Sequence, residues 1–103
     1  MSSRTPKSLP HNPHPGELLL EEFIEPFGLS QNGLARALRV PPRRINEIVL
    51  GKRAVSADTD LRLCRYFGLS EGFFLRLQIA HDLMEARRKK GKEIERDVSP
   101  MAA

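Results

Sequence analysis

Polar side chains gather in residues 42–47 of this 103-residue chain, where the sequence reads Pro-Arg-Arg-Ile-Asn-Glu. In the major groove of DNA, arginine can donate to guanine, asparagine can bridge adenine, and glutamate can accept from cytosine. Residues of these types on the outward side of one helix are therefore expected to read base edges. The candidates are Pro42, Arg43, Arg44, Asn46 and Glu47.

Basic side chains surround this segment. Between Ser30 and Arg53 there are six lysines and arginines against one acid, Glu47, which gives a local charge of +5. Positive charge beside base-reading side chains suits the phosphates of a DNA duplex. The candidates for phosphate contact are Gln31, Arg36, Arg39, Lys52 and Arg53.

Proline, glycine and capping residues divide the chain into five helices, and almost nothing alternates as a strand would. The predicted helices run from Pro15 to about Pro26, from Ser30 to about Leu38, from Pro41 or Pro42 to Gly51, from Ser56 to Gly68, and from Ser70 to about Lys90. We expect an all-α domain over residues 14–90, between a flexible arm at residues 1–13 and a flexible tail at residues 91–103.

Apolar residues recur at spacings of three and four, so each helix has a predicted core face. In the first and fourth helices the inward residues are Leu19, Leu20, Phe23, Ile24, Phe27, Leu61, Leu63, Cys64 and Phe67. Leu34, Leu38 and Ile45 are apolar where two short helices that cross at a steep angle must face a shared core. This is the pattern of a helix-turn-helix. Arg39 stands where glycine is usual, and a left-handed backbone there costs about 1 kcal/mol.

The fifth helix carries two apolar stripes on nearly opposite faces. One is formed by Phe73, Leu77, Ala80 and Met84, and the other by Leu75, Ile79, Leu83 and Ala86. A monomer can bury only one of them, so the second stripe is expected to form a symmetric dimer interface. The alternative is that the arm or the tail covers it, although these segments contain few large apolar residues.

Size and composition exclude several classes of protein. The chain is 11.7 kDa with a net charge of +4 and a pI of about 9.7, which favours a polyanionic partner over a deep active-site cleft. It shows no convergent catalytic or metal-binding set, so we expect no enzyme activity and no cofactor. A single cysteine, Cys64, and the absence of a signal peptide indicate a cytoplasmic protein.

Three stretches resemble one family: residues 14–17, residues 29–53, and residues 73–83. The resemblance as a whole extends from His14 to Arg88, about 75 residues. The chain is similar to the HigA/VapI group of antitoxins within the Xre, phage-repressor-like helix-turn-helix proteins. The resemblance implies a homodimer that neutralises a RelE-like, mRNA-cleaving toxin and represses its own operon at a palindromic operator. The sequence departs from the family at Phe74, Arg76 and His81, where Trp, Asn and Tyr are usual.

The first helix carries four glutamates and no basic residue. A ribonuclease toxin must be basic to hold RNA, so an acidic face suits its inhibitor. The candidate toxin contacts are Glu17, Glu21, Glu22 and Glu25. A solvated face that keeps the helix soluble explains these residues equally well, and a stand-alone repressor or a small basic ribonuclease remain alternative functions.

Overall fold

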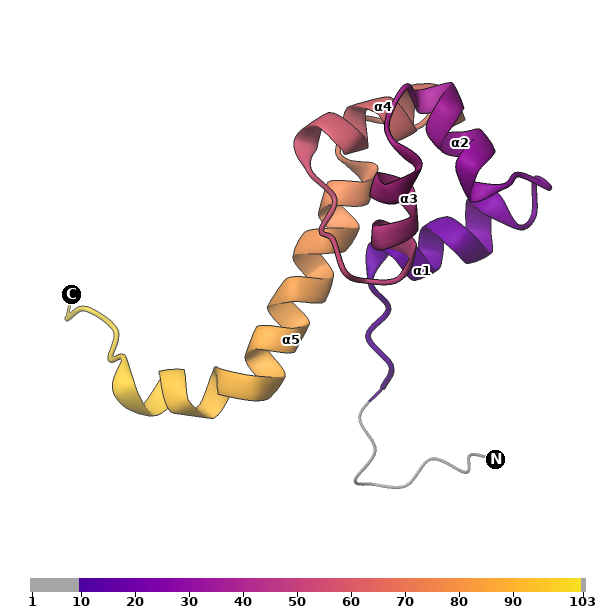
Figure 1. Cartoon of the computed structure of the whole chain (residues 1–103). Helices are drawn as coiled ribbons and strands as arrows, with labels where there is room; N and C mark the ends of the chain where they lie inside the picture. The colour runs from indigo at the N-terminus through magenta and orange to yellow at the C-terminus, as the bar shows by residue number, and fades with distance from the viewer. Residues whose placement is uncertain (1–9, 103) are drawn as a thin grey trace.

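The computed structural model describes residues 10–102, which fold into helices without a strand (Figure 1). The elements in order are α1 (Pro15–Leu19), η1 (Leu20–Ile24), α2 (Gln31–Leu38), α3 (Pro42–Val49), α4 (Ala57–Phe67) and α5 (Phe73–Asp97). Because η1 continues α1 directly, the predicted five-helix, all-α fold is confirmed. Residues 1–9 of the predicted arm lie outside the described residues.

The first helix begins with a capping box at His14. The His14 Nδ1 atom accepts a hydrogen bond from the Gly16 backbone N–H at 3.1 Å, and Glu17 Oε1 accepts from the His14 backbone N–H at 3.1 Å. Both bonds satisfy donors that the first turn of a helix leaves free. Pro15 follows at the first helical position, as predicted.

The end of this helix differs from the prediction. From Leu20 the helix widens to a π-helix that ends at Ile24, and a turn with Gly28 in the left-handed region (φ 66°) follows. This turn carries Phe27 out of the predicted core position, and its side chain is 64% exposed. Phe27 stacks on Phe67, with 6.3 Å between ring centroids.

The helix-turn-helix forms as the sequence predicts. Ser30 Oγ accepts from the Gly33 N–H at 2.9 Å and caps α2. Arg39 ends α2 with φ 62° and ψ 44°, so the expected left-handed residue is present. The shared core of the two helices contains Leu34, Ala35, Leu38, Ile45 and Ile48, all buried.

Helix α4 starts at its predicted cap, Ser56, and ends at Gly68. Leu63 and Cys64 are buried as expected, but Leu61 is exposed and the prediction of an inward position was wrong. The buried side of α4 is centred instead on Thr59, Asp60 and Leu63, because this side faces the start of α5.

Helix α5 begins two residues later than a Ser70 cap predicts. Gly72 is the N-cap residue, and Asp60 of α4 supplies the capping oxygens. Asp60 Oδ2 accepts from the Gly72 N–H at 2.6 Å, and Oδ1 accepts from the N–H groups of Phe74 at 2.9 Å and Leu75 at 3.1 Å. A buried carboxylate from one helix therefore satisfies the free N–H groups of another.

The far end of α5 also differs from the prediction. The helix continues past Lys90 and Gly91 to Asp97, so residues 91–97 of the predicted tail are helical. Good helix formers follow Gly91, and one glycine costs only about 1 kcal/mol. Figure 1 shows α5 extending away from the other helices. Accordingly only Phe74 of α5 is buried, whereas Ala80 and Met84 of the predicted core face are exposed.

The segment before α1 lies along α5. Asn12 Nδ2 donates to the His81 carbonyl oxygen at 3.0 Å and to Glu85 Oε2 at 3.1 Å, and Arg88 donates to the Pro10 carbonyl oxygen at 2.6 Å. His81, Glu85 and Arg88 share one helix face, which leaves the opposite face of α5 uncovered by residues 10–13.

None of the helices in residues 10–102 is both long and apolar enough to span a membrane.

Candidate nucleic-acid interface

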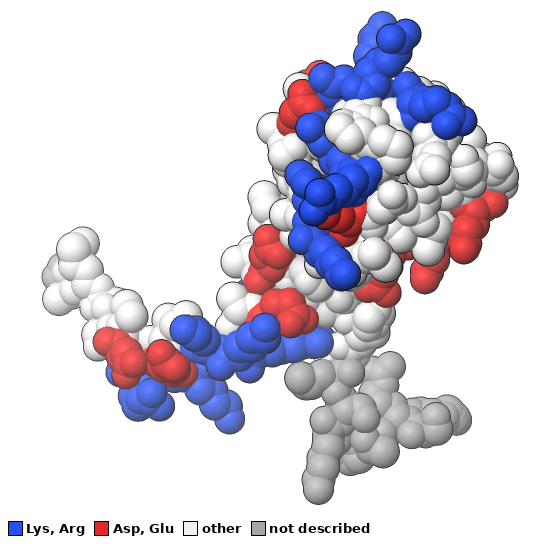
Figure 2. All heavy atoms as spheres, in the orientation of Figure 1, with Lys and Arg blue, Asp and Glu red and all other residues white. Residues whose placement is uncertain are grey.

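Lysine and arginine side chains cross the face on which α3 lies, whereas acidic side chains gather over α1 and η1 (Figure 2). Helix α3 is fixed in this position from behind by Ile45 and Ile48, which are almost fully buried. Val49 also packs against the core, and the other side chains of α3 are exposed or half-buried. The segregation of charge predicted from the sequence is thus present on the folded surface.

Glu47 holds two arginines together on this face. Its Oε2 atom lies 2.8 Å from Arg43 Nε, and its Oε1 atom lies 2.9 Å from Arg53 Nη2. Hydrogen bonds donated by Arg43, and to a lesser extent by Arg53, lower the pKa of the Glu47 carboxyl and so favour its ionised form. Both guanidinium groups keep further N–H donors, which are free to bond guanine or phosphate oxygens.

Asn46 and Gln31 form the second polar pair. Asn46 Nδ2 donates to Gln31 Oε1 at 2.7 Å, and both side chains are half-buried between α2 and α3. The bond joins a predicted base-reading residue to a predicted phosphate contact. It fixes the Asn46 amide in one orientation, which favours selective bonding to one base edge.

Arg44 lies differently from its predicted outward position. It turns toward α4, where its Nη1 atom lies 3.0 Å from Asp58 Oδ2 and its side chain is 30% exposed. Asp58 also binds Arg62 Nε at 2.9 Å, and the hydrogen bond from Arg62 lowers the pKa of the Asp58 carboxyl. The first turn of α4, which contains Asp58, places this carboxylate within reach of Arg44.

The other predicted nucleic-acid contacts are on the surface. Pro42 is exposed at the first position of α3, and Arg36, Arg39 and Lys52 are exposed around it. These three basic side chains form no ion pair with any residue from 10 to 102. They are therefore available to phosphate groups without breaking a contact.

The four glutamates of the first helix are not equivalent. Glu17 belongs to the capping box and lies 2.8 Å from His11 Nε2, and this hydrogen bond lowers the pKa of the Glu17 carboxyl. Glu21, Glu22 and Glu25 are exposed.

In the described part of the chain, no group of three or more His, Cys, Asp or Glu residues could hold a metal ion.

The predicted dimer stripe is mostly uncovered. Leu75 packs partly against the core, but Ile79 is 57% exposed, Leu83 is 55% exposed, and Ala86 is also exposed. Ile94 lies on the same face and is 51% exposed. Sequence reasoning missed Ile94 because it placed residues 91–103 in a tail, although the apolar spacing continues to this residue.

The fold and this surface define a helix-turn-helix protein, and comparison with known proteins gives the same result. The helix-turn-helix family model HTH_3 matches residues 20–74. The chain belongs to this family. Over 77 residues it is 53% identical to Virulence-associated protein I of Dichelobacter nodosus, which covers 75% of this chain and 71% of that protein.

Solved structures resemble the whole described fold. The Pseudomonas aeruginosa antitoxin HigA with the higBA promoter superposes with a TM-score of 0.84 at 41% identity, covering 89% of this chain and 100% of HigA. The antitoxin GraA in complex with its operator gives a TM-score of 0.85 at 40% identity, covering 94% of this chain and 98% of GraA. The resemblance to HigA-type antitoxins in the Xre-like class is thereby confirmed.

Proposed function

We propose that this chain is a DNA-binding antitoxin that represses its own operon by binding a palindromic operator as a homodimer. The observation that carries the proposal is the face of α3, where Arg43, Glu47 and Arg53 form one ion-paired cluster beside the fixed Asn46 amide. The HigA and GraA structures, described with a promoter and an operator, support this use of the same fold.

In this proposal α3 enters the major groove. Arg43 donates to guanine, Asn46 bonds adenine, Glu47 orients Arg43 or accepts from cytosine, and Pro42 contacts the groove at the start of the helix. Arg44 contributes to base reading once it leaves Asp58. The phosphate contacts are Gln31, Arg36, Arg39, Lys52 and Arg53.

Gel-shift titrations with the DNA upstream of the operon test this assignment. Arg43→Ala is expected to lose about 1–3 kcal/mol of specific binding and to relax selectivity at one base pair, because it removes a base contact. Lys52→Ala is expected to weaken specific and non-specific DNA alike. Lys92→Ala on α5, away from α3, is the control. An Arg43→Ala protein that binds the operator like the parent chain contradicts the proposal.

The homodimer is supported by the uncovered apolar stripe of α5. Residues 10–13 bind the opposite face of α5, so they do not cover Ile79, Leu83 and Ile94. A second chain placed on this stripe by a two-fold axis buries the same residues on both protomers. Such a dimer presents two α3 helices to successive major grooves about 34 Å apart.

A small basic ribonuclease toxin of the RelE-like class is the second proposed partner. The exposed glutamates at positions 21, 22 and 25 form an acidic surface on the side of the domain away from the basic residues. Charge reversal by Glu21→Lys with Glu22→Lys is expected to slow association with the toxin encoded beside this chain. Unchanged association kinetics exclude this surface.

Two alternatives are separated by simple observations. If the chain is a stand-alone repressor, no small basic protein copurifies with it from its own cells. If it is a small basic ribonuclease, the purified protein degrades RNA and a point substitution abolishes the activity. The proposed antitoxin acts in the cytoplasm, where both its operon and the messenger RNA cut by its toxin are found.

A further inference from the structure

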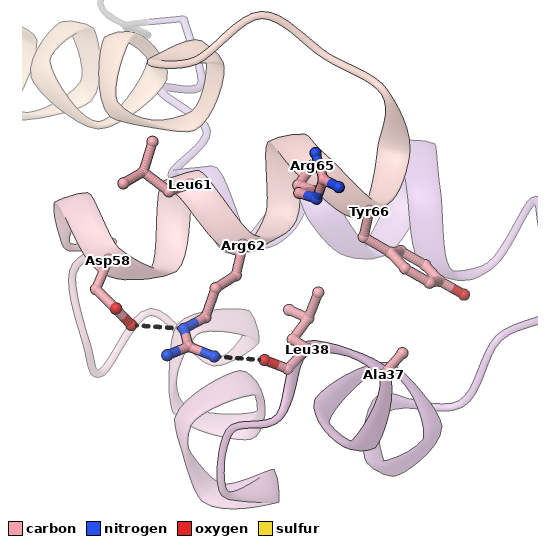
Figure 3. Close-up of a pocket in the computed structure, with 7 residues that line it drawn as sticks. All are labelled: Ala37, Leu38, Asp58, Leu61, Arg62, Arg65 and Tyr66. Carbon is pink, nitrogen blue, oxygen red and sulfur yellow. Dashed lines mark hydrogen bonds and ion pairs between the residues drawn. The ribbon is translucent and has the colours of Figure 1, made fainter.

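A pocket of about 440 Å³ lies between the end of α2 and the outer side of α4 (Figure 3). Ala37, Leu38, Leu61 and Tyr66 provide its apolar lining. Leu61 is 47% exposed and Tyr66 is 46% exposed, so two large hydrophobic residues of this pocket remain in contact with solvent. The volume falls in the range of roughly 300–1,000 Å³ that small-molecule sites occupy.

Positive charge dominates the polar part of the pocket. Arg62 donates from Nε to Asp58 at 2.9 Å and from Nη1 to the Leu38 carbonyl oxygen at 2.8 Å, as the dashed lines in Figure 3 show. Arg65 forms no hydrogen bond or ion pair with the described part of the chain. Asp58 is the single acid of the lining, and it is shared by Arg62 and Arg44, so Arg65 is left without an acidic partner among the described residues.

We infer that this pocket binds a small amphipathic anion: a carboxylate or phosphate that carries an aromatic or branched aliphatic group. Arg65 and the free donors of Arg62 hold the anion, and Leu38, Leu61 and the Tyr66 ring cover the apolar group. A neutral molecule leaves the excess charge unsatisfied, and a bare phosphate leaves the exposed apolar side chains in water. A DNA duplex is too broad to enter a pocket of this size.

Occupancy is coupled to α3 through Asp58. An anion that attracts Arg62 weakens its bond to Asp58, and Asp58 is then left with Arg44 as its principal partner. Arg44 is thereby held against α4 and away from the groove-facing side of α3. This second step rests on the proposed DNA-binding function, and it predicts that the ligand lowers operator affinity. By linkage the operator lowers ligand affinity by the same factor.

Amide NMR titration of the full chain without DNA tests the site itself. The probes are phenyl phosphate, inorganic phosphate as the anion alone, and benzyl alcohol as the neutral aromatic. Phenyl phosphate is expected to shift the signals of Ala37, Leu61 and Tyr66 and to bind about tenfold tighter than either other probe. Equal affinity for phenyl phosphate and benzyl alcohol, or shifts spread evenly over all basic surfaces, overturns the inference.

Matched variants separate the pocket from general charge effects. Arg65→Gln is expected to weaken phenyl phosphate binding about tenfold, and Lys92→Gln, which removes the same charge from α5, is expected to leave it unchanged. Thermal unfolding confirms that both variants fold. Equal affinities in the two variants overturn the site. Operator titrations with and without phenyl phosphate then test the coupling, and an unchanged operator affinity overturns only that step.

Discussion

Arg39 holds the turn of the helix-turn-helix in a backbone conformation that favours glycine. With φ 62° it lies in the left-handed region, where a Cβ atom costs about 1 kcal/mol. Its guanidinium is exposed and forms no ion pair within residues 10–102, and it is also a proposed phosphate contact. Arg39 therefore lowers the stability of the turn while it adds positive charge to the proposed DNA-binding surface.

Arg39→Gly is expected to raise the free energy of unfolding by about 1 kcal/mol and the melting temperature by about 4–8 °C, because glycine relieves the left-handed conformation. Calorimetry or thermal circular dichroism measures this. Arg36→Gly is the control, because it removes the same charge from a helical position of α2. Its free energy of unfolding is expected to fall by about 1 kcal/mol. A destabilised Arg39→Gly protein contradicts the interpretation of this turn.

Asp60 of α4 connects this helix to the start of α5 through hydrogen bonds. Its carboxylate accepts three backbone N–H bonds while the residue is only 1% exposed. Asp60→Asn keeps the shape but directs an amide N–H₂ group at backbone donors. We expect a loss of about 2 kcal/mol in unfolding free energy.

Urea unfolding of Asp60→Asn measures this loss. Asp82→Asn serves as the matched control. Asp82 is exposed on α5 and, among the described residues, its side chain bonds only the Gln78 amide, so the substitution is expected to cost less than about 0.5 kcal/mol. Equal stabilities for the two variants exclude the capping role of Asp60.

At the scale of elements, α1 and α3 pack closely because Gly16 has no side chain. A Cβ atom at Gly16 would lie 1.8 Å from the Ile48 carbonyl oxygen, a backbone atom of the helix proposed to read DNA. The position of α3 therefore depends on a glycine in the first turn of α1.

Gly16→Ala is expected to cost about 3 kcal/mol or more, because backbone atoms cannot move aside as a flexible side chain can. Gly91→Ala on α5 meets only the Arg87 side chain at 3.4 Å, and it is expected to gain up to about 1 kcal/mol through helix propensity. Circular dichroism melts compare both with the parent chain. A stable Gly16→Ala protein contradicts the close packing.

For the whole molecule, the net charge of +4 conceals two surfaces of opposite sign. The basic face of α3 and the acidic surface of η1 suit partners of opposite charge, a nucleic acid and a basic protein. The projecting half of α5 differs from both, because it carries uncovered apolar side chains beside its charged ones. Its uncovered apolar side chains favour a second copy of the chain, which is the basis of the proposed dimer.

Leu83→Glu is expected to convert the proposed dimer into a monomer of 11.7 kDa, because it places two like charges in an apolar interface. Light scattering coupled to size-exclusion chromatography measures the mass. Met84→Glu changes the neighbouring residue, which lies about 100° away around the helix, and it is expected to remain dimeric. A Leu83→Glu protein that stays dimeric excludes this stripe as the interface.

Features that depend on local spacing could be predicted from the amino-acid sequence alone. The start of α1 at Pro15, the caps at Ser30 and Ser56, and the left-handed Arg39 follow from residues within one or two turns of each other. The helix-turn-helix core could be predicted for the same reason, since its apolar residues repeat at helical spacing. The family could be predicted because residues 14–17 and 73–83, which resemble it, lie on either side of the helix-turn-helix at residues 29–53.

Contacts between residues distant in the sequence are visible only in the folded chain. Asp60 caps a helix that begins 13 residues later, Arg44 turns to a carboxylate on α4, and Asn12 bonds α5 across 69 residues. Local pattern carries no signal for such pairs, because they form only when packing brings two helix ends or faces together. Packing also decided which apolar residues are exposed, and hence where a partner or a ligand can bind.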